Sequence, residues 1–204
     1  MPSAWACVCG MLAAGSVIAW WLPTPWLDWQ PALAWAEPWR WVSAAWVHWS
    51  PLHLGANLLA VAVVAALGGV ARLPAAAALA VVLAWPLTHL GLLMQPALAH
   101  YGGASGVVHA AVAAAACWLV AGGFSHKEGR GGARTRTIGV AIAAGLAVKV
   151  LLEAPWAGPL AYPRGWDIAT APLAHASGAL AGAVCSIAVG LGLRVMRGRG
   201  RAVH

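Results

Sequence analysis

The chain has 204 residues, of which 62% are hydrophobic and only 8% are charged, and its mean hydropathy is +0.77. Because a water-soluble domain keeps about a quarter of its residues charged, these values exclude a soluble globular protein and indicate a membrane protein. The net charge of +7 favours attraction to anionic lipid over nucleic-acid binding, since the Arg-rich tail is short and directly follows an apolar segment.

Hydropathy divides the chain into six apolar segments, each close to the ~20 residues that a helix needs to cross a hydrocarbon core of ~30 Å. Helices are expected because lipid offers no partner to unpaired backbone groups. We therefore predict an all-α, polytopic membrane protein in which residues 1–204 form a single domain. The first segment lacks the charged start of a signal peptide, so we expect it to be retained. The predicted spans are Ala4–Leu22, Pro51–Val70, Pro74–Met94, Ser105–Gly123, Thr137–Ala154 and Ala171–Leu193.

The first predicted loop, residues 23–50, is rich in tryptophan. Nine of the 14 tryptophans lie between Trp20 and Trp49. Tryptophan prefers the headgroup region, where its ring is buried and its N–H finds a partner. We therefore expect this loop to lie in the outer interface of the membrane.

The second span begins with the polar residues His53 and Asn57. Residues four apart share one helix face, so both side chains point the same way. They could form an interhelical hydrogen bond, or they could donate hydrogen bonds to an oxyanion. The second span alone does not decide between these interpretations.

The fourth span opens with the sequence Gly-Ala-Ser-Gly from Gly103 to Gly106. The serine could simply cap the helix, and such a motif arises often by chance in a chain this rich in alanine and glycine. The functional interpretation is that Ser105 is a nucleophile whose flanking glycines let a substrate carbonyl approach the backbone.

Lys149 and Glu153 lie four residues apart near the outer end of the fifth span. This spacing allows an ion pair on one helix face. A plain ion pair explains the two residues at least as well as a role in steadying a helix that gates access to a site.

The sixth span begins with His175, followed by Gly178 and Gly182. The two glycines form a GxxxG face, which favours close packing against another helix. A lone buried histidine is more often structural than catalytic. Here, however, the glycine face carries His175 toward whichever helix packs there.

The basic residues concentrate in one set of predicted loops and in the C-terminal tail. The positive-inside rule places those loops and both termini in the cytoplasm. The second, fourth and sixth spans then run inward, so the three polar motifs at their starts all lie in the outer half of the membrane. This convergence brings a nucleophile, a base and oxyanion donors together. The cytoplasmic basic residues are Arg72, Lys127, Arg130, Arg134, Arg136, Arg194, Arg197, Arg199 and Arg201, whereas the opposite loops hold Arg40 and Arg164 with Asp28, Glu37 and Asp167.

These motifs resemble the rhomboid family of intramembrane serine proteases over nearly the whole chain. Rhomboids have a six-helix core, GxSG at the head of the fourth helix, HxxxN in the second and AHxxGxxxG in the sixth. Residues Glu37 to Arg40 resemble the Trp-Arg element of the rhomboid first loop, and His48 and His53 follow it at the family's spacing.

The resemblance implies that Ser105 is the nucleophile and His175 the general base, a dyad without an acidic partner. A neutral imidazole within hydrogen-bond reach can take the serine proton and return it to the leaving amine. His53 and Asn57, with the backbone from Gly103 to Ser105, would form the oxyanion hole. Water must reach the site, so a polar cavity open to the outside is expected.

Two further histidines are secondary candidates. His48 is expected to line the cavity. His109 follows Ser105 by four residues, where many rhomboids have a tyrosine that packs against the catalytic histidine, and by spacing alone it could itself reach Ser105. We prefer His175 as the base because the GxxxG motif brings it in.

The pattern from Ser105 to Ala110 resembles the rhombosortase subfamily. Rhombosortases are thought to process secreted proteins whose C-terminal tail has a glycine-rich motif, a hydrophobic helix and a basic end. The resemblance therefore implies a membrane-anchored protein substrate with such a tail. It also implies a bacterial-type inner membrane and a site that opens to the extracytoplasmic side. The expected partners are this substrate and the bilayer, with no nucleic acid.

No cofactor or metal is expected. No zinc-type CxxC pair exists, and we interpret the four cysteines as small apolar residues that fill the spans. They are Cys7, Cys9, Cys117 and Cys185.

Two other functions remain open. The chain could be a noncatalytic relative of the rhomboids that binds membrane segments, although such relatives usually lack the serine or the histidine. It could also be a small proton-linked transporter with His53, His89 and His175 as relay groups. Inverted repeats and broken helices are typical of transporters, and we find neither in the sequence.

Overall fold

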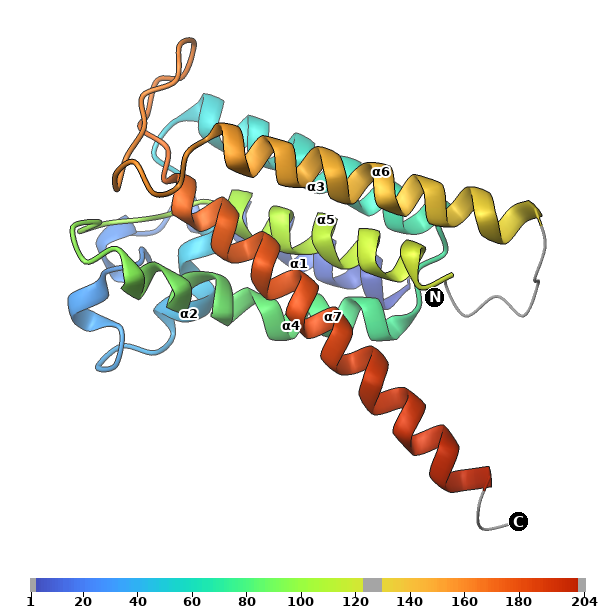
Figure 1. The fold of residues 1–204 in the computed structure, drawn as a ribbon. Helices are drawn as coiled ribbons and strands as arrows, with labels where there is room; N and C mark the ends of the chain where they lie inside the picture. Colours follow the sequence, from blue (N-terminus) through green and yellow to red (C-terminus); the bar gives the residue numbers. More distant parts are fainter. Residues whose placement is uncertain (1–2, 123–129, 202–204) are drawn as a thin grey trace.

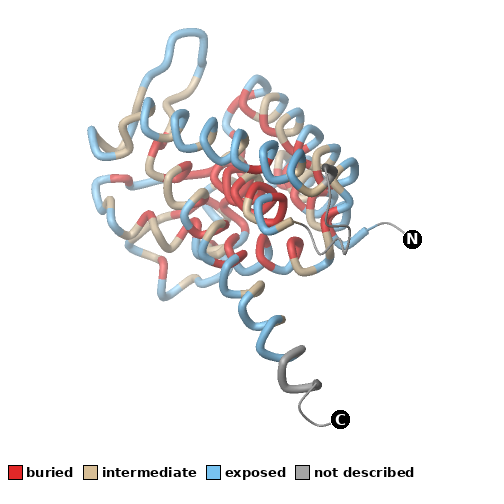
Figure 2. The backbone as a smooth tube through the Cα atoms, turned by 45° about the vertical axis from the view of Figure 1, so that its right-hand side comes forward, coloured by how far each residue is buried: buried red, intermediate tan, exposed pale blue. Residues whose placement is uncertain are grey.

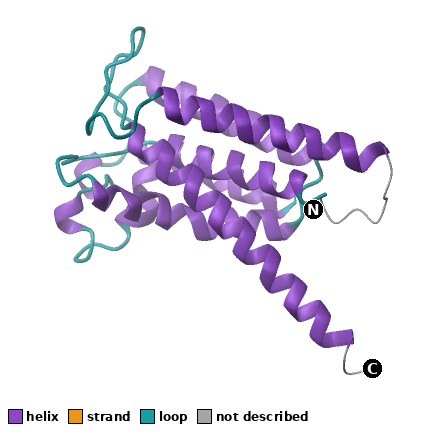
Figure 3. Cartoon of the chain, viewed as in Figure 1, coloured by secondary structure: helices purple, strands orange, loops and turns teal. Residues whose placement is uncertain are grey.

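The computed structural model describes residues 3–122 and 130–201. Within these ranges the regular structure is helical, and the only β pairing consists of isolated bridges, Trp29 with Tyr101 and Ala161 with Thr170. The predicted all-α class is confirmed for this part of the chain. Figure 3 shows long helices joined by loops, most of which gather at one end of the bundle.

Six helices form the bundle, and four of them are long and apolar enough to cross a membrane. This makes the chain a multi-pass membrane protein. The helices α1 and α5 are apolar but have 16 residues each, which is about 24 Å of helix. That these two also cross the membrane therefore stays a prediction. The six helices are α1 (Ala4–Ala19), α3 (Pro51–Val70), α4 (Ala75–Leu90, continued to Met94 by the 3-10 turn η4), α5 (Ser105–Val120), α6 (Arg130–Leu152) and α7 (Pro172–Arg201).

Two helices extend beyond their predicted spans. α6 begins at Arg130 instead of Thr137, and α7 continues past Leu193 to Arg201. Arginine is a good helix former, so the backbone stays helical where the sequence becomes basic. The hydropathy pattern therefore located the apolar part of each helix and not its ends.

The direction of the helices brings three helix starts together. α3, α5 and α7 all begin at the end of the bundle that carries the first loop, and α1, α4 and α6 run the opposite way (Figure 1). Local sequence sets one of these starts: the Ser50 hydroxyl accepts a hydrogen bond from the His53 backbone N–H at 3.0 Å, and Pro51 occupies the first helical position.

The helix α5 forms the centre of the bundle. Twelve of its 16 residues are buried, whereas α6 is mostly exposed, as Figure 2 shows. Because lipid can solvate the apolar face of α6, exposure there is no packing defect.

The glycines of α7 let it lie directly on α5. A Cβ at Gly178 would overlap the backbone oxygen of Gly106, and a Cβ at Gly182 would overlap that of Ala110. The expected GxxxG packing is confirmed, and its partner is the helix that begins at Ser105.

The first loop is folded around a buried arginine. Arg40 donates hydrogen bonds to the Asp28 backbone oxygen at 2.6 Å, to the Asp28 carboxylate at 3.0 Å and to the Glu37 carboxylate at 2.6 Å. A buried guanidinium is stable only when its donors are paired in this way. The loop comprises the short helix α2 (Arg40–Ser43) and the 3-10 turns η1 (Thr24–Trp26), η2 (Pro31–Leu33) and η3 (Ala44–Trp46).

The tryptophans of this loop differ in burial, and Trp41 and Trp46 are half-buried. Trp29 is fully buried, whereas the exposed ones fit the expected interfacial position. The exposed tryptophans of the loop and its edge are Trp21, Trp26, Trp35, Trp39 and Trp49.

Candidate active site

Ser105 lies in the first turn of α5. Two residues before it, the backbone adopts a conformation that favours glycine. Gly103 has a φ of +132°, which other residues rarely adopt, and a Cβ there would lie 2.7 Å from His53 Nε2. The Gly103 N–H donates to the Ala44 oxygen at 2.9 Å, and the Tyr101 hydroxyl donates to the Gly103 oxygen at 3.1 Å. The first loop and α3 thus fix the chain that presents Ser105.

His175 lies in the first turn of α7, and the close α5–α7 contact brings it to Ser105. The distance between His175 Nε2 and Ser105 Oγ is 2.9 Å. Both residues lie at the end of the bundle where α3, α5 and α7 begin. The residues predicted as nucleophile and base are therefore hydrogen-bonded neighbours.

A carboxylate contacts the other side of the His175 ring. Glu153, directly after α6, has Oε2 at 2.7 Å from His175 Nδ1, while its Oε1 accepts a hydrogen bond from Lys149 Nζ at 2.6 Å. The resemblance implied a dyad without an acidic partner, so this contact is a departure from the expectation. The sequence signal is an acidic residue at the outer end of a span, whose spacing from Lys149 predicts an ion pair or a role in steadying that helix but no contact with His175.

Glu153 is ionised at neutral pH. Partial burial raises the pKa of its carboxyl group, but the hydrogen bonds from His175 and Lys149 and the positive charge of Lys149 outweigh burial and lower the pKa to about 2. An ionised carboxylate only accepts hydrogen bonds, so His175 Nδ1 carries the proton of this contact and Nε2 is free to accept from the Ser105 hydroxyl.

His109 stacks on His175 and does not replace it. The ring centroids are 4.2 Å apart and the planes are within 10° of parallel. His109 Nδ1 lies 2.6 Å from the Ser105 backbone oxygen, so its N–H donates a hydrogen bond to that carbonyl. The Ser105 hydroxyl donates its hydrogen bond to His175 Nε2 at 2.9 Å.

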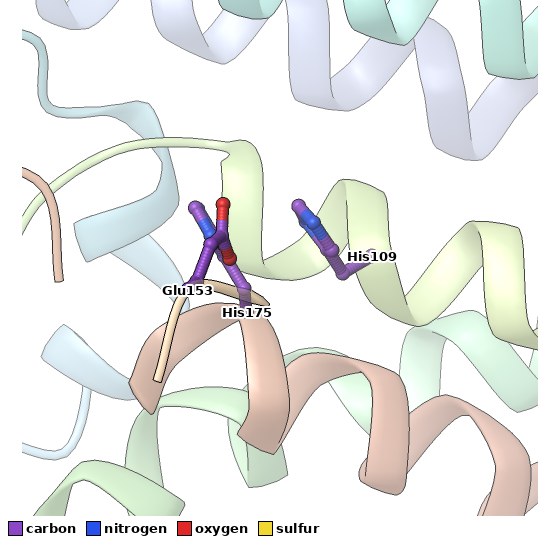
Figure 4. Close-up of side chains that lie close together, drawn as sticks. All are labelled: His109, Glu153 and His175. Carbon is purple, nitrogen blue, oxygen red and sulfur yellow. The ribbon is translucent and has the colours of Figure 1, made fainter. Parts of the chain in front are cut away.

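His109, Glu153 and His175 form a cluster whose potential metal-ligand atoms lie within 4.8 Å of one another (Figure 4). An imidazole binds a cation through a lone pair in its ring plane. Because the two rings are stacked and nearly parallel, one cation cannot lie in both planes. The arrangement suits ring stacking and a hydrogen bond better than chelation.

His53 and Asn57 lie on α3 next to Gly103. His53 Nε2 faces the space that a Gly103 side chain would fill, and Asn57 Nδ2 lies 3.9 Å from the same point. Asn57 Nδ2 also donates to the His53 backbone oxygen at 3.0 Å, which leaves its second N–H available. Both predicted oxyanion residues therefore lie beside the backbone that leads to Ser105.

His48 does not line the cavity as expected, because it packs against the His53 ring instead. Their ring centroids are 4.6 Å apart, and His48 Nδ1 lies 3.1 Å from the Trp46 backbone oxygen. Burial lowers the pKa of His48 to about 4, although the hydrogen bond to Trp46 acts in the opposite direction. His48 is therefore neutral at physiological pH and packs against His53.

A cavity of about 670 Å³ joins these groups. A volume of this size accommodates a peptide segment or a drug-sized ligand. The segment from Leu160 to Pro172 covers one side, and the Ser50 hydroxyl ties that cover to α3 by donating to Asp167 at 2.9 Å. The functional side chains that line the cavity are Ser105, His175, His53, Asn57, His109 and Glu153.

Comparison with known protein families finds a match to the Rhomboid domain over residues 36–191. The match extends from the first loop through most of α7 and includes every residue described in this site. A comparison with curated proteins found no match.

Proposed function

The chain belongs to the rhomboid family of intramembrane serine proteases, and from this premise we propose that it is itself an intramembrane serine endopeptidase. Ser105 is the nucleophile and His175 the general base. The observation that carries the proposal is the 2.9 Å contact between Ser105 Oγ and His175 Nε2 in a cavity at the end of the bundle.

The reaction proceeds in two halves. Ser105 Oγ attacks the scissile carbonyl carbon while its proton moves to His175 Nε2, and the tetrahedral intermediate collapses as the same proton passes to the leaving amine. A water molecule then attacks the resulting ester, with His175 taking its proton and returning it to Ser105 Oγ. The enzyme ends as it began, and one peptide bond has been hydrolysed.

We propose that His53, Asn57 and the backbone N–H of Ser105 stabilise the oxyanion. Support comes from the position of His53 Nε2 and Asn57 Nδ2 beside Gly103, where the missing side chain leaves room for a substrate carbonyl. Fixed donors at such a site stabilise the charge that develops in the transition state.

The orientation and location are also proposals. Both termini lie in the cytoplasm of a bacterial-type cell, and the cavity opens to the extracytoplasmic side of the inner membrane. The support is the concentration of arginines at the ends of spans opposite the site, including Arg72, Arg134 and Arg194.

We propose a membrane-anchored substrate whose C-terminal tail has a glycine-rich motif, a hydrophobic helix and a basic end, as in the rhombosortase subfamily. The basic end holds the tail's C-terminus in the cytoplasm, which leaves the glycines at the depth of Ser105. Glycine-rich backbone unwinds readily and needs little room, so it fits a covered cavity.

Co-expression with a tailed reporter tests this function. The wild type should release the reporter by cutting near the glycines, and Ser105→Ala should leave it anchored. Replacing the glycines by valines should block release. If the tail stays intact while an unrelated anchored helix is cut by the wild type but not by Ser105→Ala, the substrate is wrong and the protease function stands.

A further inference from the structure

The ring of His175 is held from both of its nitrogens. Nε2 meets the Ser105 hydroxyl at 2.9 Å, and Nδ1 meets the Glu153 carboxylate at 2.7 Å. Figure 4 shows the Glu153 carboxylate directly beside the His175 ring. The side chains come from three different elements, α5, the end of α6 and α7, so the line from carboxylate through imidazole to hydroxyl is a product of the tertiary fold.

We propose that Glu153 is a positioning residue for His175, which makes the site a serine–histidine–glutamate arrangement. This inference rests on the proposed protease function and deepens it. Glu153 touches neither the nucleophile nor the substrate carbonyl, so it acts through the histidine.

The carboxylate performs two tasks in the proton transfer. Before the reaction, it accepts the Nδ1 proton, which keeps Nε2 unprotonated and aimed at Ser105. When Ser105 loses its proton to Nε2, both ring nitrogens carry protons and the ring becomes positive. The Glu153 carboxylate then lies against that charge and stabilises it without taking a proton itself.

The competing explanation is that Glu153 serves only an ion pair at the end of α6. The two contacts use different oxygens, since Lys149 binds Oε1 and His175 binds Oε2. Lys149 is half exposed, so its pair alone contributes little to stability. If the ion pair were the whole role, removing Lys149 would match removing Glu153.

Several other charged or titratable groups line the cavity near His175, and they can also affect how the reaction rate depends on pH. The pH profiles of two variants are therefore comparable only when both variants keep these groups. None of them is changed in the variants described below except Lys149. They are His109 on α5, Lys149 on α6, Tyr101 before α5 and His53 on α3 across the cavity.

The experiment measures how fast a fluorophosphonate probe reacts with Ser105 in membranes that contain the full-length protein. In this reaction the Oγ–P bond forms, the P–F bond breaks with loss of fluoride, and the serine proton passes to His175. The rate constant therefore reports on the base without requiring a known substrate.

Four variants separate the explanations. Glu153→Ala should react at least about tenfold more slowly than the wild type, and Glu153→Gln should be intermediate because its amide oxygen still accepts from Nδ1. Lys149→Gln should stay within about twofold. The matched control is Glu37→Gln, since Glu37 is a carboxylate with the same exposed side-chain fraction of 29% in an ion pair with Arg40, and neither residue lines the cavity.

The pH profile distinguishes positioning from a structural role. The Glu153 carboxylate stabilises the positive ring that forms when Ser105 gives its proton to Nε2, and a purely structural role would not involve that charge. Glu153→Gln keeps the shape and the hydrogen-bond acceptor but removes the charge, so its pH profile should differ from that of the wild type, whereas Glu37→Gln should keep the wild-type profile.

The outcomes separate the two proposals. If both Glu153 variants react at the wild-type rate with the wild-type pH profile, while Ser105→Ala does not react, Glu153 has no positioning role and the protease function stands. Equal losses in Lys149→Gln and Glu153→Gln would also overturn the positioning role. If Ser105→Ala reacts like the wild type, the protease function itself fails. Should Glu153→Ala not insert, the nearly isosteric Glu153→Gln decides by its pH profile.

Discussion

At the level of single residues, Asn57 is proposed to donate a hydrogen bond to the oxyanion. Its amide lies beside the backbone that precedes Ser105, with one N–H bound to the His53 oxygen and the other able to reach an oxyanion. A donor that strengthens its bond only as charge develops accelerates the chemical step, because it binds the transition state more tightly than the ground state.

We expect Asn57→Ala to lower kcat for tail cleavage by about 100-fold with little change in KM, since one oxyanion donor is worth about that much. Ser105→Ala and His175→Ala should each abolish cleavage, because nucleophile and base act as a unit. His109→Phe should retain activity, since a phenyl ring can still stack on His175. A dead His109→Phe beside an active His175→Ala would identify His109 as the base.

The contact between α5 and α7 is the decisive feature at the scale of elements. It depends on the missing side chains of Gly178 and Gly182, and it sets the position of His175 one turn before Gly178. Helix packing and the proposed contact between nucleophile and base therefore depend on the same interface.

Gly178→Val should separate the helices, because its side chain would overlap the Gly106 backbone oxygen. Overpacking of this kind costs about 1–3 kcal/mol, so the melting temperature in detergent should fall and cleavage should be lost. Gly190→Val is the matched control, since it lies on the same helix with nothing within 4 Å of the added carbon. Equal behaviour of the two variants would show that the close contact is unimportant.

Sequence reasoning located the elements whose signals are local. The polar pair of α3, the serine at the start of α5 and the glycine face of α7 each follow from residue spacing, and the alternation of span directions brings their starts together. The sequence does not predict that Glu153 contacts His175, because this hydrogen bond joins residues 22 apart and depends on how α6 ends. The fold of the first loop around Arg40 was missed for the same reason.

At the level of the whole molecule, the distribution of basic residues predicts how the bundle is oriented in the membrane. Both ends of the described chain lie away from the cavity end of the bundle (Figure 1). Arg72 follows the end of α3, Arg134 lies near the start of α6 and Arg194 lies in the C-terminal part of α7, so these arginines also lie away from the cavity end. This distribution supports the proposal that the cavity opens to the extracytoplasmic side.

A reporter fused after His204 should be cytoplasmic, and one inserted between Trp156 and Thr170 should be extracytoplasmic. Paired alkaline phosphatase and fluorescent protein fusions measure the two sides independently. Two reporters on the same side would contradict the six-span topology, because only α7 lies between the two positions.

The central claim is that Ser105 is a nucleophile activated by His175. Fluorophosphonate labelling in membranes, followed by mass spectrometry of the modified peptide, tests this claim without any assumption about the substrate. The control is Ser177→Ala, since Ser177 lies two residues after His175 on α7 and donates to the Thr88 oxygen at 2.9 Å. We expect an adduct on Ser105 in the wild type and in Ser177→Ala. We expect no adduct in Ser105→Ala or in His175→Ala. Undiminished labelling of Ser105→Ala, or an adduct on another residue in the wild type, would contradict this claim.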